Sequence, residues 1–172
     1  MASDKPTNIL LFCTDDHGAW ALGSYGNREV QSPTLDALAA SGTRFDHAYT
    51  PVPVCSPARA CLITGKTPSQ VGIHDWLQEA DERVVGRDWL ADQRALFQTF
   101  HESNYHTGLF GKIHLGWSEV VPPGVDDYFG ARRTQNLHNG GCAFLDNGTP
   151  VERDVNRSEA ITDRVLAFLD SH

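Results

Sequence analysis

The chain has 172 residues, of which 40% are hydrophobic and 21% are charged, as in an ordinary soluble globular protein of one domain. Its net charge of −8 excludes the basic surface that a nucleic-acid-binding protein uses. The four cysteines show no C-x-x-C spacing, which excludes a zinc ribbon and a dense disulfide framework.

The N-terminal region carries neither a targeting signal nor a membrane signal. The apolar run from Ile9 to Phe12 is too short for the core of a signal peptide, and no stretch is long enough to span a membrane. We therefore expect a cytoplasmic protein that has no membrane partner.

Residues 8–14 form a continuous apolar run, which predicts a strand buried on both faces of a parallel sheet. Asp15, Asp16 and Gly18 follow it, and ligand sites in α/β sheets lie beyond the carboxyl ends of strands. Two adjacent carboxylates suit Ca²⁺ or Mg²⁺, provided that the strand ends there and the chain bends. A polar turn with a capping aspartate is the alternative interpretation.

The next segment predicts a helix and a short strand. Ser32 followed by Pro33 is a helix-start signal, and Gly42 is a stop signal. Leu35 and Leu38 lie on one face of this helix and are expected in the core. Residues 45–49 favour a short strand.

A second helix-start signal, Ser56 as N-cap with Pro57 at the first helical position, predicts a helix that ends at Gly65. Cys55 is then expected just outside the helix N-terminus, where backbone N–H groups attract anions. Arg59 follows about one turn later and can direct its guanidinium to the same place. The alternative is a small buried cysteine at the start of an unremarkable helix.

The middle of the chain predicts a second helix–strand pair with a polar segment after the strand. Residues 90–103 favour an amphipathic helix, and residues 105–110 favour a buried strand. Lys112 and His114 follow, and in an extended chain they project to the same side. A cation and an imidazole suit chemistry on an anionic group, whereas the alternative is a basic, solvated loop.

The C-terminal part predicts loops and one helix. We expect solvated Asp126 and Asp127 in a turn-rich loop, and a surface excursion over residues 132–148. Asn156 starts a final helix, with Glu159 completing its capping pattern.

These motifs, in this order, resemble the type I sulfatases. Cys55-Ser56-Pro57-Ala58-Arg59, continued by Leu62-Ile63-Thr64-Gly65, resembles the C-x-P-x-R…T-G signature of that family. Gly111-Lys112-Ile113-His114-Leu115-Gly116 resembles its G-K-W-H-L-G motif, with Ile113 at the tryptophan position. The resemblance implies an α/β fold of the alkaline-phosphatase-like type, a sandwich whose mostly parallel central sheet is flanked by helices.

The resemblance also implies a chemistry and a set of site residues. Cys55 would be oxidised to formylglycine by a formylglycine-generating enzyme, and Asp15, Asp16 and residue 55 would hold Ca²⁺ or Mg²⁺. Arg59 and Lys112 would stabilise the sulfate oxygens, and His114 would act as a base. The substrate would be a small sulfate ester, in keeping with an acidic chain that repels polyanions.

The resemblance covers residues 1–172 as the N-terminal part of a sulfatase catalytic domain, without the family's later metal ligands. We therefore expect a truncated chain with weak or no turnover. Hydrolysis of phosphonate or phosphate monoesters is the nearest alternative function, and a catalytically silent anion-binding domain is the other. A cysteine phosphatase fits poorly, because its arginine follows the cysteine by six residues rather than four.

Overall fold

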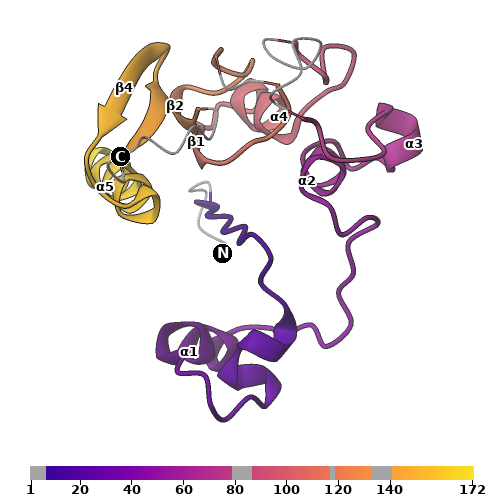
Figure 1. Cartoon of the computed structure of the whole chain (residues 1–172), viewed down its shortest axis with the longest axis vertical. Coiled ribbons are helices and arrows are strands. Elements are labelled where there is room, and N and C mark those ends of the chain that lie inside the picture. The colour runs from indigo at the N-terminus through magenta and orange to yellow at the C-terminus, as the bar shows by residue number, and fades with distance from the viewer. Residues whose placement is uncertain (1–6, 79–86, 117–118, 133–140) are drawn as a thin grey trace, which may run out of the picture. The chain divides into compact units, whose positions relative to one another are not determined.

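The computed structural model describes residues 7–78, 87–116, 119–132 and 141–172, which form two compact units (Figure 1). Unit 1 comprises residues 1–49 and unit 2 comprises residues 50–172. None of the helices in the described part of the chain combines the length and the apolar character needed to cross a bilayer.

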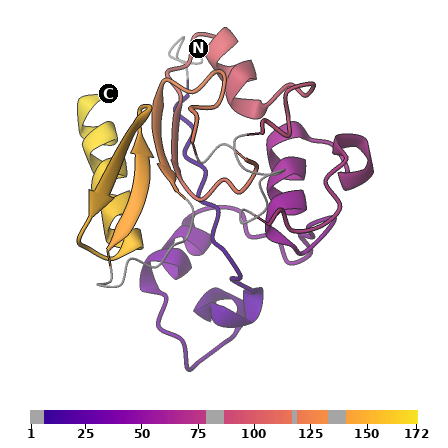
Figure 2. The ribbon, with the colours of Figure 1, turned by 45° about the horizontal axis from the view of Figure 1, so that its top comes forward.

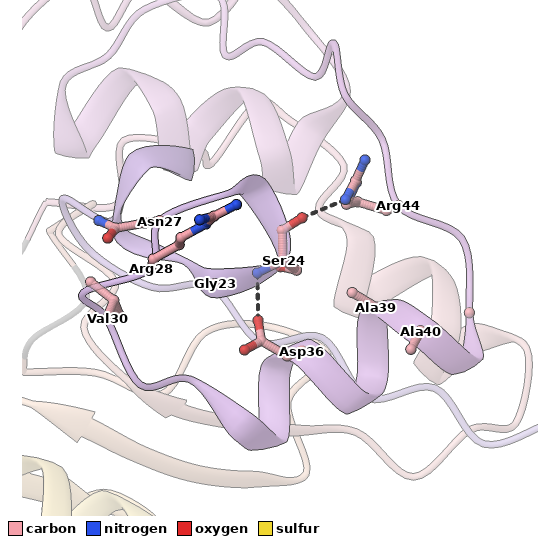
Figure 3. Close-up of a pocket in the computed structure, with 10 residues that line it drawn as sticks. Gly23, Ser24, Asn27, Arg28, Val30, Asp36, Ala39, Ala40 and Arg44 are labelled. Carbon is pink, nitrogen blue, oxygen red and sulfur yellow. Dashed lines mark hydrogen bonds between the residues drawn. The ribbon is translucent and has the colours of Figure 1, made fainter.

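Unit 1 contains two short 3₁₀ helices and one α-helix: η1 (Ala19–Ala21), η2 (Gly23–Tyr25) and α1 (Pro33–Ser41). The start of α1 after Ser32 and its end at Gly42 confirm the predicted helix. The Ser32 hydroxyl accepts a hydrogen bond from the Gly23 N–H at 2.9 Å and donates one to Asp36 at 3.0 Å. Asp36 also accepts the Ser24 N–H at 2.6 Å, so these bonds fasten η2 to α1 (Figure 3).

The predicted core face of α1 is wrong. Leu35 is 42% exposed and Leu38 is 64% exposed, and no residue of α1 is buried. An apolar helix face becomes a core only when a second layer covers it. The described residues of unit 1 contain no such layer.

The two strands predicted in unit 1 do not form. Residues 8–14 are assigned no strand, and Phe12 is 76% exposed rather than buried. Residues 45–49 are likewise irregular. A strand needs a neighbour to pair its backbone N–H and C=O groups, and the described part of unit 1 offers none.

Unit 2 is built on a four-stranded sheet in the order β1-β2-β3-β4. Its strands are β1 (Gly108–Gly111), β2 (Asp127–Ala131), β3 (Cys142–Asp146) and β4 (Thr149–Arg153). β1 and β2 pair in parallel, whereas β2–β3 and β3–β4 pair antiparallel. The α/β class and the strand near residues 105–110 are confirmed, but the described sheet is mixed rather than mostly parallel.

The β3–β4 hairpin corrects the predicted surface excursion over residues 132–148, of which 133–140 lie outside the described residues. Asn147 and Gly148, with φ of 46° and 86°, form the two-residue turn between the strands. Two successive positive φ angles match the twist of a hairpin, which is why Asn-Gly is favoured there. Phe144 and Leu145 on β3 are buried, because the hairpin completes the sheet.

The sheet of unit 2 is covered on both faces (Figures 1 and 2). Successive residues of a strand point to opposite faces, and Tyr128 and Phe129 accordingly belong to two separate core clusters. One cluster includes Ala160 of α5 (Arg157–Ser171), and the other includes Ala60 of α2 (Cys55–Thr64). The Asn156 side chain caps α5 by accepting the Ser158 N–H at 2.9 Å.

Two short helices complete this second face: α3 (Pro68–Val71) and α4 (Leu96–Glu102). The predicted helix over residues 90–103 begins six residues late, because Leu90 opens a turn that is held by the Asp88 carboxylate at 2.8 Å. Leu90 is nevertheless buried, whereas Leu96 is exposed.

Candidate active site

The candidate nucleophile lies in the first turn of a helix. α2 begins at Cys55, because Val54 has an extended backbone, and it ends at Gly65, whose φ of 68° is left-handed. Cys55 is half-buried, whereas Cys61 in the same helix is buried, and burial raises the pKa of the Cys61 thiol. Of these two thiols, Cys55 is the accessible one, and it stands where the helix presents backbone N–H groups.

Ser56 is not the N-cap that the sequence predicts. It is the second residue of α2, it is completely buried, and its hydroxyl accepts the Leu77 N–H at 3.1 Å. The hydroxyl therefore joins the start of α2 to the segment around residue 77.

Arg59 connects the cysteine helix to the loop after β1. It follows Cys55 by four residues, a spacing that places both on one face of a helix. Its Nη1 donates to the backbone oxygen of Lys112 at 2.6 Å. The structure therefore brings together two of the predicted motifs, although they are 53 residues apart in sequence.

The loop after β1 corrects the predicted orientation of Lys112 and His114. Gly111 and His114 both have positive φ, of 99° and 58°, so the chain is not extended there. Lys112 is exposed and His114 is buried, which means that they do not project to the same side. A left-handed non-glycine residue is strained, and such strain is concentrated at functional sites.

His114 has two neighbours that make opposite demands on its Nε2 atom: one requires a lone pair there and the other requires a hydrogen. Its Nε2 lies 2.8 Å from the indole Nε1 of Trp76 and 2.8 Å from the backbone oxygen of Leu77. An indole N–H only donates and a carbonyl only accepts, so Nε2 can serve one of them at a time. Neither Trp76 nor Leu77 is among the residues that the sequence motifs identify.

Ser56, Leu77 and His114 form a buried polar connection across unit 2. The Leu77 N–H reaches the start of α2 and the Leu77 carbonyl faces the imidazole. The segment around Leu77 thus helps to position both the start of α2 and the loop that carries His114. No sequence motif signals it, because backbone groups of an apolar residue make both contacts.

The candidate metal ligands Asp15 and Asp16 belong to unit 1, whereas the other site residues belong to unit 2: Cys55, Arg59, Lys112 and His114. Both are exposed, and Asp16 has φ of 52°, so the chain bends where the carboxylates occur. This bend meets the condition under which adjacent side chains can reach one ion. Carboxylate oxygens are suitable ligands for Ca²⁺ or Mg²⁺. That Asp15 and Asp16 bind one ion together with residue 55 stays a prediction.

A shallow hollow of about 790 Å³ lies elsewhere in unit 1 (Figure 3). Arg28 and Arg44 line it, and the Arg44 guanidinium donates to the Ser24 carbonyl. None of the predicted site residues lines this hollow.

Asp126 is an exposed loop residue as predicted, whereas Asp127 is half-buried as the first residue of β2, which corrects its prediction as a solvated loop residue. Asp126 accepts the Thr107 N–H at 2.9 Å, and Asp127 is paired with Arg164 at 2.6 Å. Both carboxylates have a structural role: Asp126 connects the start of β2 to the residue before β1, and Asp127 connects β2 to α5.

Comparison with known proteins decides the family. The sequence model of the sulfatase family matches residues 7–171, almost the whole chain. The chain belongs to the sulfatase family. The motifs that suggested this relationship are the same ones that Arg59 joins in the structure.

Relatives of this sulfatase-family chain are longer enzymes. It is 40% identical over 125 residues to arylsulfatase A of Bos taurus, which covers 73% of this chain and 24% of the relative. It is 29% identical over 171 residues to N-acetylglucosamine-6-O-sulfatase of Bacteroides thetaiotaomicron, which covers 97% of this chain and 28% of the relative. The chain thus spans about a quarter of the length of these curated relatives.

A solved structure has the same fold over most of this chain. It is described as a complex with its substrate D-glucosamine-2-N,6-O-disulfate, and it superposes with a TM-score of 0.73 at 27% identity. The match covers 92% of this chain and 30% of that protein.

Proposed function

We propose that this chain carries the nucleophile and part of the anion-binding site of a sulfate-ester hydrolase. The observation that supports this most directly is the bond between Arg59 and the Lys112 carbonyl. It holds the cysteine helix against the lysine–histidine loop, and the sulfatase signature predicts that these two segments share a site.

The proposed work of the protein side chains follows from their charge and position. A sulfate ester resists attack because its oxygens are electron-rich, so positive charge must be placed around them. Arg59 and Lys112 supply that charge at the N-terminus of α2, where backbone N–H groups add to it. His114 exchanges a proton through Nε2 once that atom gives up its contact with Trp76 or Leu77.

Two further components belong to the proposal. Residue 55 acts as formylglycine, which a formylglycine-generating enzyme makes from the Cys55 thiol. Asp15 and Asp16 hold Ca²⁺ or Mg²⁺ together with residue 55, and when bound, the ion supplies positive charge and activates an oxygen nucleophile.

The proposed substrate is a small sulfate ester. The related solved structure is described with a sulfated glucosamine as its substrate, and the present chain carries a net charge of −8. A small substrate limits the charge repulsion that a long sulfated polymer would meet at an acidic surface.

The proposal is tested by co-expressing the chain with a formylglycine-generating enzyme and measuring the mass of the peptide that contains residue 55. The purified chain is then assayed with an aryl sulfate, an aryl phosphonate and an aryl phosphate in Ca²⁺ or Mg²⁺. Cys55→Ser is the variant that cannot be converted, and Cys61→Ser is the matched control on the same helix.

We expect conversion at residue 55 in the wild type and in Cys61→Ser, and turnover of the sulfate above the phosphonate. Even weak turnover is decisive when it disappears in Cys55→Ser. An intact thiol together with no turnover would overturn the proposal and favour a silent anion-binding domain. Preference for the phosphonate would assign the site to the alternative hydrolase.

A further inference from the structure

A second group of ligand-bearing side chains lies in unit 2, away from the candidate active site. His106, Asp127 and His172 each offer one ligand atom, and these atoms lie within 4.8 Å of one another. His106 precedes β1, Asp127 is the first residue of β2, and His172 follows α5. The group therefore gathers at the end of the two parallel strands where they begin.

The fold itself brings the three residues together. β1 and β2 are in parallel register, with Gly108 opposite Asp127, which places His106 beside the start of β2. Phe168 of α5 packs on Phe110 at 5.3 Å between ring centroids and on His106 at 5.8 Å. The end of α5 thereby brings the His172 ring to 4.2 Å from the His106 ring.

The charge around the group favours a cation. Asp127 and Asp146 both contact Arg164, and Asp126 lies on the other side of His106. Two carboxylates share the single Arg164 guanidinium and Asp126 adds a third beside His106, so the three carboxylates exceed the one guanidinium by two negative charges when the histidines are neutral. Burial alone would raise the pKa of Asp127, but hydrogen bonds from Arg164 and His106 lower it, which keeps the carboxylate ionised.

The neighbouring groups orient the candidate ligand atoms. Asp127 Oδ1 accepts from Arg164 at 2.6 Å, while Oδ2 faces the Nε2 of His106 at 3.2 Å. The opposite nitrogen of His106, Nδ1, lies 4.0 Å from Asp126. This separation is too long for a hydrogen bond, and Asp126 is instead bonded to His101 and to the Thr107 N–H, so Asp126 contributes negative charge near His106 rather than a direct support.

We propose that His106, Asp127 and His172 bind a divalent transition-metal ion of the zinc type. Two imidazoles and one carboxylate are a three-ligand set for Zn²⁺, which keeps a fourth position for water. Ligand atoms around tetrahedral Zn²⁺ lie about 3.3 Å apart, a spacing that rotation of the two exposed imidazoles supplies. The ion replaces the proton shared by His106 and Asp127 and separates the stacked rings.

The proposed ion ties the end of α5 to the starts of β1 and β2. His106 precedes β1 and Lys112 follows it, so the strand separates this group from the candidate catalytic loop. The ion therefore acts on stability and does not take part in sulfate-ester chemistry. The inference is independent of the proposed function.

The test titrates the full chain with Co²⁺ in the presence of millimolar Mg²⁺, which occupies oxygen sites such as Asp15 and Asp16. Co²⁺ replaces Zn²⁺ and is visible by absorption, and thiolate ligands give an intense charge-transfer band that imidazole and carboxylate ligands lack. His106→Ala and His172→Ala remove exposed ligands, so both variants are expected to fold. His47→Ala, which removes an exposed histidine from unit 1, is the matched control.

We expect one Co²⁺ per wild-type chain without a thiolate band, and a loss of affinity of at least about tenfold in each ligand variant. Zn²⁺ should raise the midpoint of thermal unfolding in the wild type and in His47→Ala but not in His106→Ala. Unchanged Co²⁺ affinity in both ligand variants would overturn the proposal. A thiolate band would overturn it as well, because it would place the ion on cysteine.

Discussion

Removing the Ser56 hydroxyl should destabilise unit 2 although it deletes a single atom. Ser56 is completely buried, and its oxygen accepts the buried Leu77 N–H at 3.1 Å. In Ser56→Ala this N–H loses its partner without gaining water. Leaving a buried donor unpaired costs about 1–3 kcal/mol in the free energy of unfolding.

The assay is urea unfolding followed by tryptophan fluorescence, with thermal unfolding as a second measurement. For a chain of this size, each kcal/mol lowers the unfolding midpoint by about 2–4 °C, so we expect a decrease of roughly 2–12 °C. Ser69→Ala removes an exposed serine from α3 and should change the free energy of unfolding by less than about 0.5 kcal/mol.

A Ser56→Ala curve that coincides with the curves of wild type and Ser69→Ala would contradict this prediction. That result would mean that the Leu77 N–H finds another partner at no cost. A changed urea dependence would instead indicate a different unfolded or native ensemble, and the comparison would then rest on the thermal midpoint.

Three other substitutions test separate parts of the structure. Arg59→Gln should reduce the weak sulfate-ester turnover of the modified chain to background and lower the unfolding midpoint by roughly 1–6 °C, because the bond to the Lys112 carbonyl is lost, as measured by initial rates and thermal unfolding. Phe144→Ala should cost about 3–5 kcal/mol in urea unfolding, because Phe144 is fully buried and stacked on Phe129. Burial alone would raise the pKa of Asp126, but hydrogen bonds from Thr107 and an adjacent histidine lower it from 3.8 to about 2. This carboxylate therefore stabilises the fold above pH 4 or so, and the contribution is lost as the pH falls toward 2. Asp126→Asn should accordingly show a smaller loss of stability over that range in acid titrations, and a loss equal to that of the wild type would contradict the assignment.

Helices with local start and stop signals could be predicted from the sequence. Ser32 and Gly42 delimit α1, Gly65 ends α2, and Asn156 caps α5, because each signal acts within one turn of the chain. The β3–β4 hairpin also carries a local signal, because Asn147-Gly148 is a preferred two-residue turn, although the sequence interpretation placed a surface excursion there.

Features that depend on distant partners could not be predicted. The apolar run at residues 8–14 has strand character, but a strand exists only where neighbours pair with it. The orientations of Lys112 and His114 depend on the left-handed backbone at His114, for which the sequence around this residue gives no local signal. The residues of the candidate site could be predicted because their side chains carry reactive or charged groups. The contacts of Leu77 with Ser56 and His114 could not, because they are made by backbone groups that the fold places there.

The hydrogen bond of the Trp76 indole depends on whether Nε2 of His114 carries hydrogen, because Trp76 and the Leu77 carbonyl both contact that nitrogen. When the nitrogen carries its lone pair, the indole N–H is hydrogen-bonded; when it carries hydrogen, the Leu77 carbonyl takes over and the indole is released. The two tautomers therefore leave distinct signatures on one side chain that is 54% exposed. The N–H resonance of the Trp76 indole therefore reports whether Nε2 of this buried imidazole carries hydrogen.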